Sequence, residues 1–394
     1  MPAFDGFRAF AIFGVVFLHL TQAAGLTAAG GEMTGRVMWG SLGRAVEVLF
    51  IVSGFVVFLP TVARRGTFGS IRSFAIRRGA RLLPAYWMSL LVALALIAAF
   101  DPVSPQIEGA HVSFPGLDDI LVNFAGASVP VAMFATGFPI GFGLNPPVWT
   151  LSVELGFYIA LPLVAGAFFR WPKVALTLGA LITIGWTLAF ENLGEVTKVL
   201  QLSPDFNELI RLRFASGLQL PEWAYSFAAG MAGAVAWVRI RERWEPPRIE
   251  RVAGPVALVA LAVAAVTGWH LGGDFEQTRS SLLFSMIFTT TISVFMVALS
   301  LANPRFQFPF AARRVRQLGD ISYGIYLSHL MIAVLVATWF SMPDDGGLVS
   351  LATWTAAVVP ASVLYGYLSA RFLEQPIRRW ARRYGRRTGP AATK

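Results

Sequence analysis

The sequence contains no cysteine and few charged residues. The absence of cysteine excludes disulfides, thiolate nucleophiles and cysteine metal sites, and it is compatible with exposure to an oxidising compartment. Charged residues make up 14% of the 394 positions, against about 25% in a typical soluble domain. With 56% hydrophobic residues, this shortage of charge indicates a membrane protein. We find no internal repeat and no second, soluble domain.

Apolar runs long enough to cross a bilayer recur about ten times along the chain. We expect spans near 6–24, 43–62, 81–100, 147–169, 174–190, 221–238, 252–271, 281–301, 318–340 and 350–371. The predicted fold is therefore all-α, a polytopic integral membrane protein with about ten transmembrane helices.

The basic residues are distributed unevenly between the connections. Most of the 32 Lys and Arg residues lie in alternate connections and in the carboxyl-terminal tail. This positive-inside pattern predicts that both termini are cytoplasmic. The net charge of +10 is then a signal of topology, and we expect no nucleic-acid partner. We predict a membrane domain over 1–377 and a basic cytoplasmic tail over 378–394.

Two predicted outer connections are longer than the others. They cover 101–146 and 191–220, and loops of such length are either functional lids or simple connectors. Within the first, residues 118–124 predict a short interfacial helix.

Four ionisable residues fall inside the predicted spans, at His19, Glu47, Glu154 and His329. Because an ionisable group is costly in hydrocarbon, each is a functional hypothesis by default. Arg8 and His19 are 11 positions apart, about three helical turns, so they share a helix face with a rise of ~16 Å between them.

Chain direction places His19 and Glu154 at similar depths in the outer half of the membrane. A carboxylate beside an imidazole can fix its tautomer and let it act as a base; the alternative is a structural bond between two helices. Glu47 is expected to reach the outer interface. His329 shares a helix face with Tyr326 and is typical of a helix-packing hydrogen bond.

Arg78 and Arg81 lie three positions apart, on one face, before the third span. They either bind lipid phosphates and set topology or join Arg8 in binding a phosphorylated ligand, because arginine forks suit phosphate. No metal-ligand set is visible. The topology, with His and Glu in the membrane, also fits a transporter or flippase without chemistry.

Six fragments occur in a specific order. They are Arg8 ten residues ahead of His19, the run 49–55 with Ser53, the pair Arg78 and Arg81, the run 147–158 with Trp149, Ser152, Glu154 and Tyr158, the run 318–329 with Tyr323, Tyr326 and His329, and the closing run 374–376. With these fragments the chain resembles the acyltransferase type 3 family of integral-membrane O-acyltransferases along nearly its whole length. It departs from the family pattern at Leu49, Thr150, Leu155 and Gly156.

The resemblance implies a ten-helix enzyme that takes an acyl group, often acetyl, from cytoplasmic acyl-CoA. The usual acceptor is a hydroxyl of a surface polysaccharide, lipopolysaccharide or peptidoglycan. The family's histidine corresponds to His19 and its paired arginine to Arg8, and its basic pair corresponds to Arg78 and Arg81. Together with the depth argument, this predicts His19 as the general base with Glu154 as its partner, and Arg8, Arg78 and Arg81 as the residues that bind the CoA phosphates. Substrate or donor contacts are expected from Ser53, Trp149, Ser152, Tyr158, Tyr323, Tyr326 and His329. Whether an acyl-histidine intermediate forms stays open.

Other readings of the function remain open beside this one. The acceptor is alternatively a macrolide-like secondary metabolite, and the rival class is the transporter. The resemblance implies no permanently bound cofactor, acyl-CoA (acetyl-CoA) as co-substrate, and a multi-pass location in the bacterial inner membrane. Family members often carry an extra outer hydrolase-like domain, which this chain is too short to hold, so we expect a separate outer-face partner protein or none.

Overall fold

The computed structural model describes residues 1–29, 31–100, 114–134, 145–199, 205–272 and 279–385. These residues form helices and turns and contain no strand, which confirms the all-α prediction. Every predicted span is a helix. The ten helices are α1 (Pro2–Ala23), α4 (Ala45–Ala63), α5 (Ile71–Phe100), α8 (Trp149–Arg170), α9 (Pro172–Glu191), α12 (Ala224–Arg243), α13 (Pro246–Leu271), α14 (Arg279–Leu301), α16 (Arg313–Trp339) and α17 (Leu348–Ser369).

Within the described ranges, nine helices are long and apolar enough to cross a membrane, and α12 is the predicted span that is not among them. Its sequence is rich in Ala and Gly and ends in several arginines. The small residues serve close packing. A Cβ on Gly230 of α12 would lie 2.1 Å from the Ile51 carbonyl oxygen of α4, and one on Gly54 of α4 would lie 2.3 Å from the Phe227 carbonyl oxygen of α12. Small residues of this kind let two helix backbones approach in a membrane.

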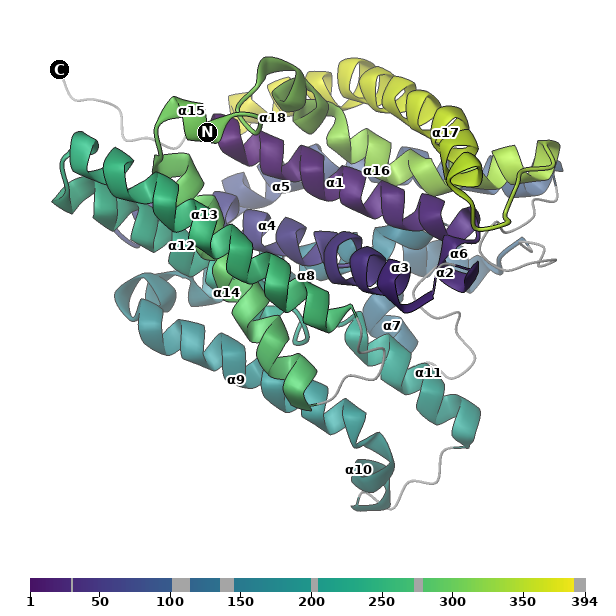
Figure 1. The fold of residues 1–394 in the computed structure, drawn as a ribbon, viewed down its shortest axis with the longest axis horizontal. Helices are drawn as coiled ribbons and strands as arrows, with labels where there is room; N and C mark the ends of the chain where they lie inside the picture. The colour runs from purple at the N-terminus through teal and green to yellow at the C-terminus, as the bar shows by residue number, and fades with distance from the viewer. Residues whose placement is uncertain (30, 101–113, 135–144, 200–204, 273–278, 386–394) are drawn as a thin grey trace.

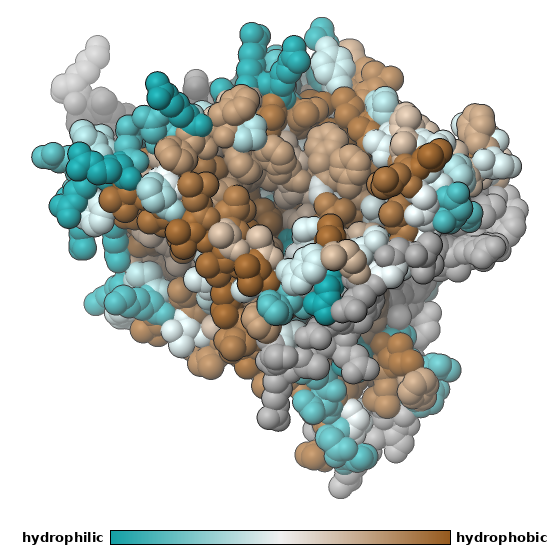
Figure 2. Space-filling view, viewed as in Figure 1, coloured by the Kyte–Doolittle hydropathy of each residue, from teal (hydrophilic) through white to brown (hydrophobic). Residues whose placement is uncertain are grey.

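Helix α1 runs through the middle of the bundle. It packs against α16 and α4, while α4 packs against α12 and α16 packs against α17. In Figure 1 it crosses the view between α16 and α4. Phe4 of α1 stacks on Phe55 of α4 with ring centroids 4.1 Å apart. Figure 2 shows apolar side chains over the middle of this face and hydrophilic ones at its left edge and along its top.

Shorter elements connect the long helices. They are α2 (Leu26–Ala29), α3 (Gly31–Val37), η1 (Met38–Leu42), α6 (Leu117–Phe124), α7 (Ser128–Phe134), η2 (Pro146–Val148), α10 (Leu193–Val199), α11 (Phe206–Gly217), α15 (Pro304–Gln307), η3 (Ala370–Glu374) and α18 (Gln375–Gly385). The helix predicted at 118–124 is confirmed as α6. Helix α18 crosses the predicted boundary at 378 and packs against α5. The rest of the predicted tail, 386–394, and the parts 101–113, 135–144 and 200–204 of the long connections lie outside the described residues.

Candidate active site

Three polar cavities follow one another along α4. The first, the acidic cavity, is lined by Glu47 near the start of the helix; the second, the central cavity, by Ser53; and the third, the basic cavity, by Arg64 just past its end. By helical rise, Glu47 and Ser53 are separated by ~9 Å along the axis, and Ser53 and Arg64 by ~16 Å. Helix α4 is therefore a common wall that connects the two ends of the bundle.

The central cavity has a volume of about 100 Å³ and lies where α1, α4, α5, α8 and α16 meet. Each of these helices contributes a residue from one of the sequence fragments. The predicted site residues that line it are Arg8, Ser53, Arg81, Glu154, Tyr323 and Tyr326. Segments far apart in the sequence thus bring guanidinium, carboxylate and hydroxyl groups into one space within the bundle.

Glu154 is held by two hydroxyl groups. Its Oε1 accepts a hydrogen bond from Ser53 Oγ at 2.8 Å and another from the Tyr158 hydroxyl, one turn further along α8. Arg8 and Glu154 also interact electrostatically, as Arg8 does with Asp5, whose carboxylate lies 3.5 Å from its guanidinium. The Glu154 carboxylate therefore lies in the same cluster as Arg8, the arginine in the first turns of α1.

His19 lies about three turns further along α1, outside this cluster. Its Nδ1 lies 3.0 Å from Gln22 Oε1, and its ring faces that of His329 with centroids 5.3 Å apart. Because a carbonyl oxygen can only accept, this contact places the proton on Nδ1 and the lone pair on Nε2. Gln22 was missed in the sequence, although its position three residues after His19 is the spacing that puts two side chains on one helix face.

The expected pairing of His19 with Glu154 is wrong in this structure. Chain direction estimates the depth of a residue along the membrane normal, but it says nothing about lateral position. Helix α8 packs against α4, whereas the part of α1 that carries His19 packs against α16. The partners of the imidazole are accordingly Gln22 and His329, and those of the carboxylate are Ser53 and Tyr158.

Tyr326 and His329 connect the central cavity to His19. The Tyr326 hydroxyl donates to the Pro147 carbonyl oxygen at 2.7 Å and lies 2.8 Å from Thr150 Oγ1. His329 Nδ1 donates to the Tyr326 carbonyl oxygen at 2.7 Å. The buried Nε2 of His329 has no hydrogen-bond partner among the described residues. The rings of Tyr326 and His329 have centroids 5.8 Å apart, and together they connect the cavity to the ring of His19.

The basic cavity, about 190 Å³ in volume, lies between the end of α4, the start of α5 and α18. No carboxylate from the described part of the chain lines it. Its cations are Arg64, Arg77, Arg78, Arg81, Arg378 and Arg382. The Arg78 guanidinium also lies 5.5 Å from the centroid of the Tyr158 ring. Arg81 lines both this cavity and the central one, so an anionic ligand bound here can extend toward Ser53 and Glu154.

Two predicted contact residues lie apart from the central cavity. The Trp149 ring packs near Phe50 and Trp223, and Ser152 Oγ lies 3.5 Å from Ser128 Oγ. Among the residues that the structure describes, no group of His, Asp and Glu is arranged to hold a metal ion.

The expectation that Glu47 reaches the interface is wrong. Only 3% of this residue is exposed, and its Oε1 accepts a hydrogen bond from Thr289 on α14. The packing of α14 against the start of α4 covers the side chain.

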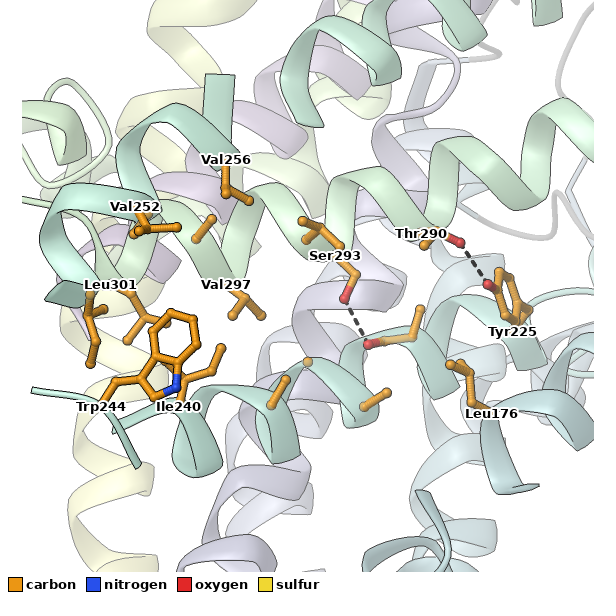
Figure 3. A pocket seen from close by; sticks show the side chains of 18 residues that line it. Leu176, Tyr225, Ile240, Trp244, Val252, Val256, Thr290, Ser293, Val297 and Leu301 are labelled. Carbon is orange, nitrogen blue, oxygen red and sulfur yellow. Dashed lines mark hydrogen bonds between the residues drawn. The ribbon is translucent and has the colours of Figure 1, made fainter. Parts of the chain in front are cut away.

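A larger cavity of about 400 Å³ lies between α12, α13 and α14 (Figure 3). Its walls are almost entirely aliphatic and aromatic. The polar groups within it are bonded to neighbours: Ser293 donates to the Ala229 carbonyl oxygen at 2.8 Å, and the hydroxyls of Tyr225 and Thr290 are 2.7 Å apart. Among the described residues that line it there is no carboxylate, histidine or arginine.

The protein is a multi-pass helical bundle whose central and basic cavities share Arg81, with a histidine pair beside Tyr326. The comparison with known proteins identifies the class of membrane enzyme to which this bundle belongs. Residues 1–371 match the family described as an acyltransferase domain, and the chain belongs to this family of membrane O-acyltransferases.

Several relatives carry names that specify O-acetyl transfer. The peptidoglycan O-acetyltransferase of Listeria monocytogenes is 23% identical over 96% of this chain and 56% of its own length. A putative O-acetyltransferase of Staphylococcus aureus is 23% identical over 96% of this chain and 57% of its own length. Nodulation protein 10 of Rhizobium leguminosarum is 26% identical, with 94% of this chain and 95% of that protein covered. The chain thus spans little more than half the length of the first and second of these relatives. No solved structure matches it.

Proposed function

We propose that this protein transfers an acyl group, acetyl in the first instance, from cytoplasmic acyl-CoA to a hydroxyl of a cell-surface glycan. The observation that carries the proposal is the shared arginine, Arg81, which lines both the basic and the central cavity. The name of the Listeria relative, a peptidoglycan O-acetyltransferase, favours a glycan acceptor. We place the enzyme in the cytoplasmic membrane with both termini in the cytoplasm. A separate outer-face protein that supplies the acceptor is part of the proposal.

In this proposal the donor binds from the basic end. The CoA phosphates lie among Arg77, Arg78 and Arg378, where planar guanidinium groups bind phosphate oxygens in pairs. The pantetheine arm then passes Arg81 and enters the central cavity. The positive-inside pattern makes this the cytoplasmic end, and acyl-CoA is therefore taken from the cytoplasm.

The chemical step takes place at the outer end of the central cavity, next to Tyr326 and His329. His19 Nε2 removes the proton from the acceptor hydroxyl while that oxygen attacks the thioester carbonyl carbon. The C–S bond breaks, the acyl group stays on the acceptor oxygen, and the CoA thiolate takes the proton back from the imidazolium. Gln22 keeps the proton of the resting imidazole on Nδ1.

Glu154 acts through the groups that it holds. Its hydrogen bonds fix Ser53 and Tyr158, and its charge balances Arg8 at the same level of the bundle. A half-buried arginine beside a carboxylate keeps a defined position, because both groups lose more solvation when separated. Glu154 is therefore a positioning residue for the thioester end of the donor.

The test is the pair His19→Ala and His19→Gln, with His270→Ala as the matched control. His270 lies on α13 with its ring stacked on Phe284 and lines none of the three polar cavities. Purified variants in proteoliposomes are assayed for transfer from radiolabelled acetyl-CoA and for equilibrium binding of CoA. Loss of the general base should lower transfer by about 10²–10⁴-fold with unchanged CoA affinity. Near-wild-type turnover of both His19 variants would contradict the assignment.

A further inference from the structure

The acidic cavity lies at the opposite end of α4 from the basic one, and none of the reaction steps above uses it. It has a volume of about 110 Å³ and is partly open. Helix ends from one side of the bundle form it: the starts of α4, α12 and α14 and the ends of α9 and α13. Its ionisable residues other than tyrosine are Arg44, Glu47, Glu191 and Glu222. In the proposed topology this is the outer end.

Glu47 brings an incompletely bonded carboxylate to this cavity. The residue is only 3% exposed, and its Oε1 accepts from Thr289. Its Oε2 has no hydrogen-bond partner among the described residues. The guanidinium of Arg44 lies 3.7 Å away, which is close enough for an ion pair but too long for a hydrogen bond. Because buried polar atoms are nearly always hydrogen-bonded, Oε2 stands out as a buried carboxylate oxygen that has an ion pair with Arg44 but no hydrogen bond.

Glu222 and Glu191 supply the other carboxylates. Glu222 Oε2 lies 2.9 Å from Thr187 Oγ1, and the Thr183 carbonyl oxygen lies at the same distance, so these two acceptors share the single proton of the Thr187 hydroxyl. Glu222 also interacts electrostatically with Glu191, Glu47 and Arg44. The four groups are therefore close enough for the charge of one to affect the others. Serine and threonine hydroxyls fill the remaining polar wall, including Ser226, Ser281, Ser285 and Thr289.

One pair of aromatic rings lies between this cavity and the central cavity. Trp223 lines the acidic cavity, Phe50 lines the central cavity, and their ring centroids are 5.1 Å apart. Trp223 is fixed by its indole nitrogen, which donates to the Gly217 carbonyl oxygen at 3.0 Å. A ligand in the acidic cavity therefore meets carboxylates on one side and an indole on the other, one aromatic pair away from the central cavity.

We infer that the acidic cavity is a binding subsite for a neutral carbohydrate, the acceptor of the transfer reaction. Sugar hydroxyls donate to Glu47 Oε2 and to the carboxylates of Glu191 and Glu222, and the C–H face of the sugar ring packs on Trp223. The inference rests on the proposed function and adds to it the site at which the acceptor binds.

Charge determines which ligand this cavity takes. Three carboxyl groups and one arginine disfavour an anion, so the CoA phosphates bind more favourably in the basic cavity, which has six arginines. Hydroxyl groups only need acceptors, and carboxylates are the strongest acceptors among side chains. A neutral polyol with an apolar face satisfies both the carboxylates and the indole.

The experiment uses the N-acetylglucosamine tetrasaccharide as the acceptor probe and full-length protein in proteoliposomes. Glu222→Gln and Glu47→Gln each replace one carboxyl group by an amide of nearly the same shape. Glu195→Gln is the matched control, because Glu195 is an exposed carboxylate paired with Lys198 at 2.7 Å outside the cavity. For each protein we measure KM for the tetrasaccharide, KM for acetyl-CoA, acetyl-CoA hydrolysis without acceptor, and tetrasaccharide binding by equilibrium dialysis.

We expect both cavity variants to raise KM and Kd for the tetrasaccharide by about 10- to 100-fold, the range for hydrogen bonds to charged groups. KM for acetyl-CoA and hydrolysis should stay at the wild-type level, which also shows that the variants are folded. Unchanged tetrasaccharide KM and Kd in both variants, or no tetrasaccharide binding by wild type, overturns the subsite while leaving donor hydrolysis as support for the proposed function. Glu222-dependent tetrasaccharide binding by a protein that neither transfers nor hydrolyses acetyl-CoA supports the subsite and overturns the proposed function.

Discussion

The two ends of α4 carry cavities of opposite charge. The basic cavity collects six arginines and no carboxylate from the described residues, and the acidic cavity collects three carboxylates and one arginine. Between them lies the central cavity, where Arg8 and Arg81 meet Glu154 and the two signs are mixed. Each end of the bundle is thus suited to one kind of ligand, an anion on one side and a neutral hydroxyl donor on the other.

The opposite charges of these cavities distinguish the two ends of the bundle for the two substrates. An acyl-CoA bound at the wrong end would place its phosphates among carboxyl groups, and a neutral sugar at the basic end would leave the arginines without a counter-charge. Both errors cost several kcal/mol in a partly buried site, where unpaired charge is expensive. We therefore expect donor and acceptor to approach the central cavity from opposite sides. The predictions below test this arrangement in order of decreasing effect.

The largest effect is expected at Arg81, which belongs to both the basic and the central cavity. Arg81→Ala should weaken CoA binding by about 10- to 100-fold, because a charge-assisted hydrogen bond contributes about 1.5–3 kcal/mol. The measurement is Kd for CoA and for dephospho-CoA by equilibrium binding. Arg78→Ala is compared in the same way, and a larger loss for CoA than for dephospho-CoA at either position assigns it to the 3′-phosphate.

Arg72→Ala is the control, because Arg72 lies exposed in the first turn of α5 and lines neither cavity. A loss of CoA affinity in Arg72→Ala equal to that in Arg81→Ala would mean that general surface charge, and not the basic cavity, attracts the donor.

An intermediate effect is expected at Glu154. Glu154→Gln retains an oxygen that accepts from Ser53 but removes the charge that balances Arg8. We expect kcat to fall by about tenfold, the equivalent of 1.4 kcal/mol, with Kd for CoA nearly unchanged. Steady-state kinetics and CoA binding separate the two. A collapse of CoA affinity at unchanged kcat would instead place Glu154 in the donor site.

The smallest effect on activity is expected at Gly54, which holds the common wall of the three cavities against α12. Gly54→Ala places a Cβ 2.3 Å from the Phe227 carbonyl oxygen, so α4 and α12 must separate. Overpacking of this kind costs about 1–3 kcal/mol, and we expect a lower Tm in detergent. Gly185→Ala on α9, where a Cβ meets nothing within 4 Å, is the control and should not lower Tm. Equal Tm values for the two variants would show that the close approach is not tight.

The sequence predicted the helices better than their packing. A long apolar run shows directly how long its helix can be, so each predicted span is a helix in the structure. The short helix predicted at 118–124 is also present, as α6. The role of α12 was not visible, because its Gly and Ala residues lower its apparent hydrophobicity while allowing contact with α4. Contacts between helices depend on faces made of small residues such as these. A single sequence does not show which of these faces pack against each other.

The same limit applies to the site. The sequence fragments named Arg8, Ser53, Arg81, Glu154 and Tyr323, and the structure brings these into one cavity. Their pairing was not predictable, since depth along the membrane normal does not give lateral position.

Two partnerships illustrate this. Glu154 joins Ser53 and Tyr158, while His19 joins Gln22 and His329. Gln22 was detectable from its spacing to His19. The acidic cavity was not, because its residues come from five helix ends spread between Arg44 and Thr289.

The central claim is that donor and acceptor reach the central cavity from opposite sides of the membrane. Because the chain has no cysteine, its orientation in vesicles can be read with single cysteines. Arg379→Cys lies at the basic end, and Ser341→Cys lies in the connection between α16 and α17. Labelling of each with an impermeant maleimide reports which end faces outward.

The decisive measurement is sided transfer in such oriented vesicles. Radiolabelled acetyl-CoA is supplied on the side of Arg379 and the tetrasaccharide on the side of Ser341, and then both are supplied on one side. We predict acetylated tetrasaccharide only when donor and acceptor are on these opposite sides. Activity that requires both on the side of Arg379 would contradict the account and would favour a small cytoplasmic acceptor, such as a macrolide-like metabolite, over a surface glycan.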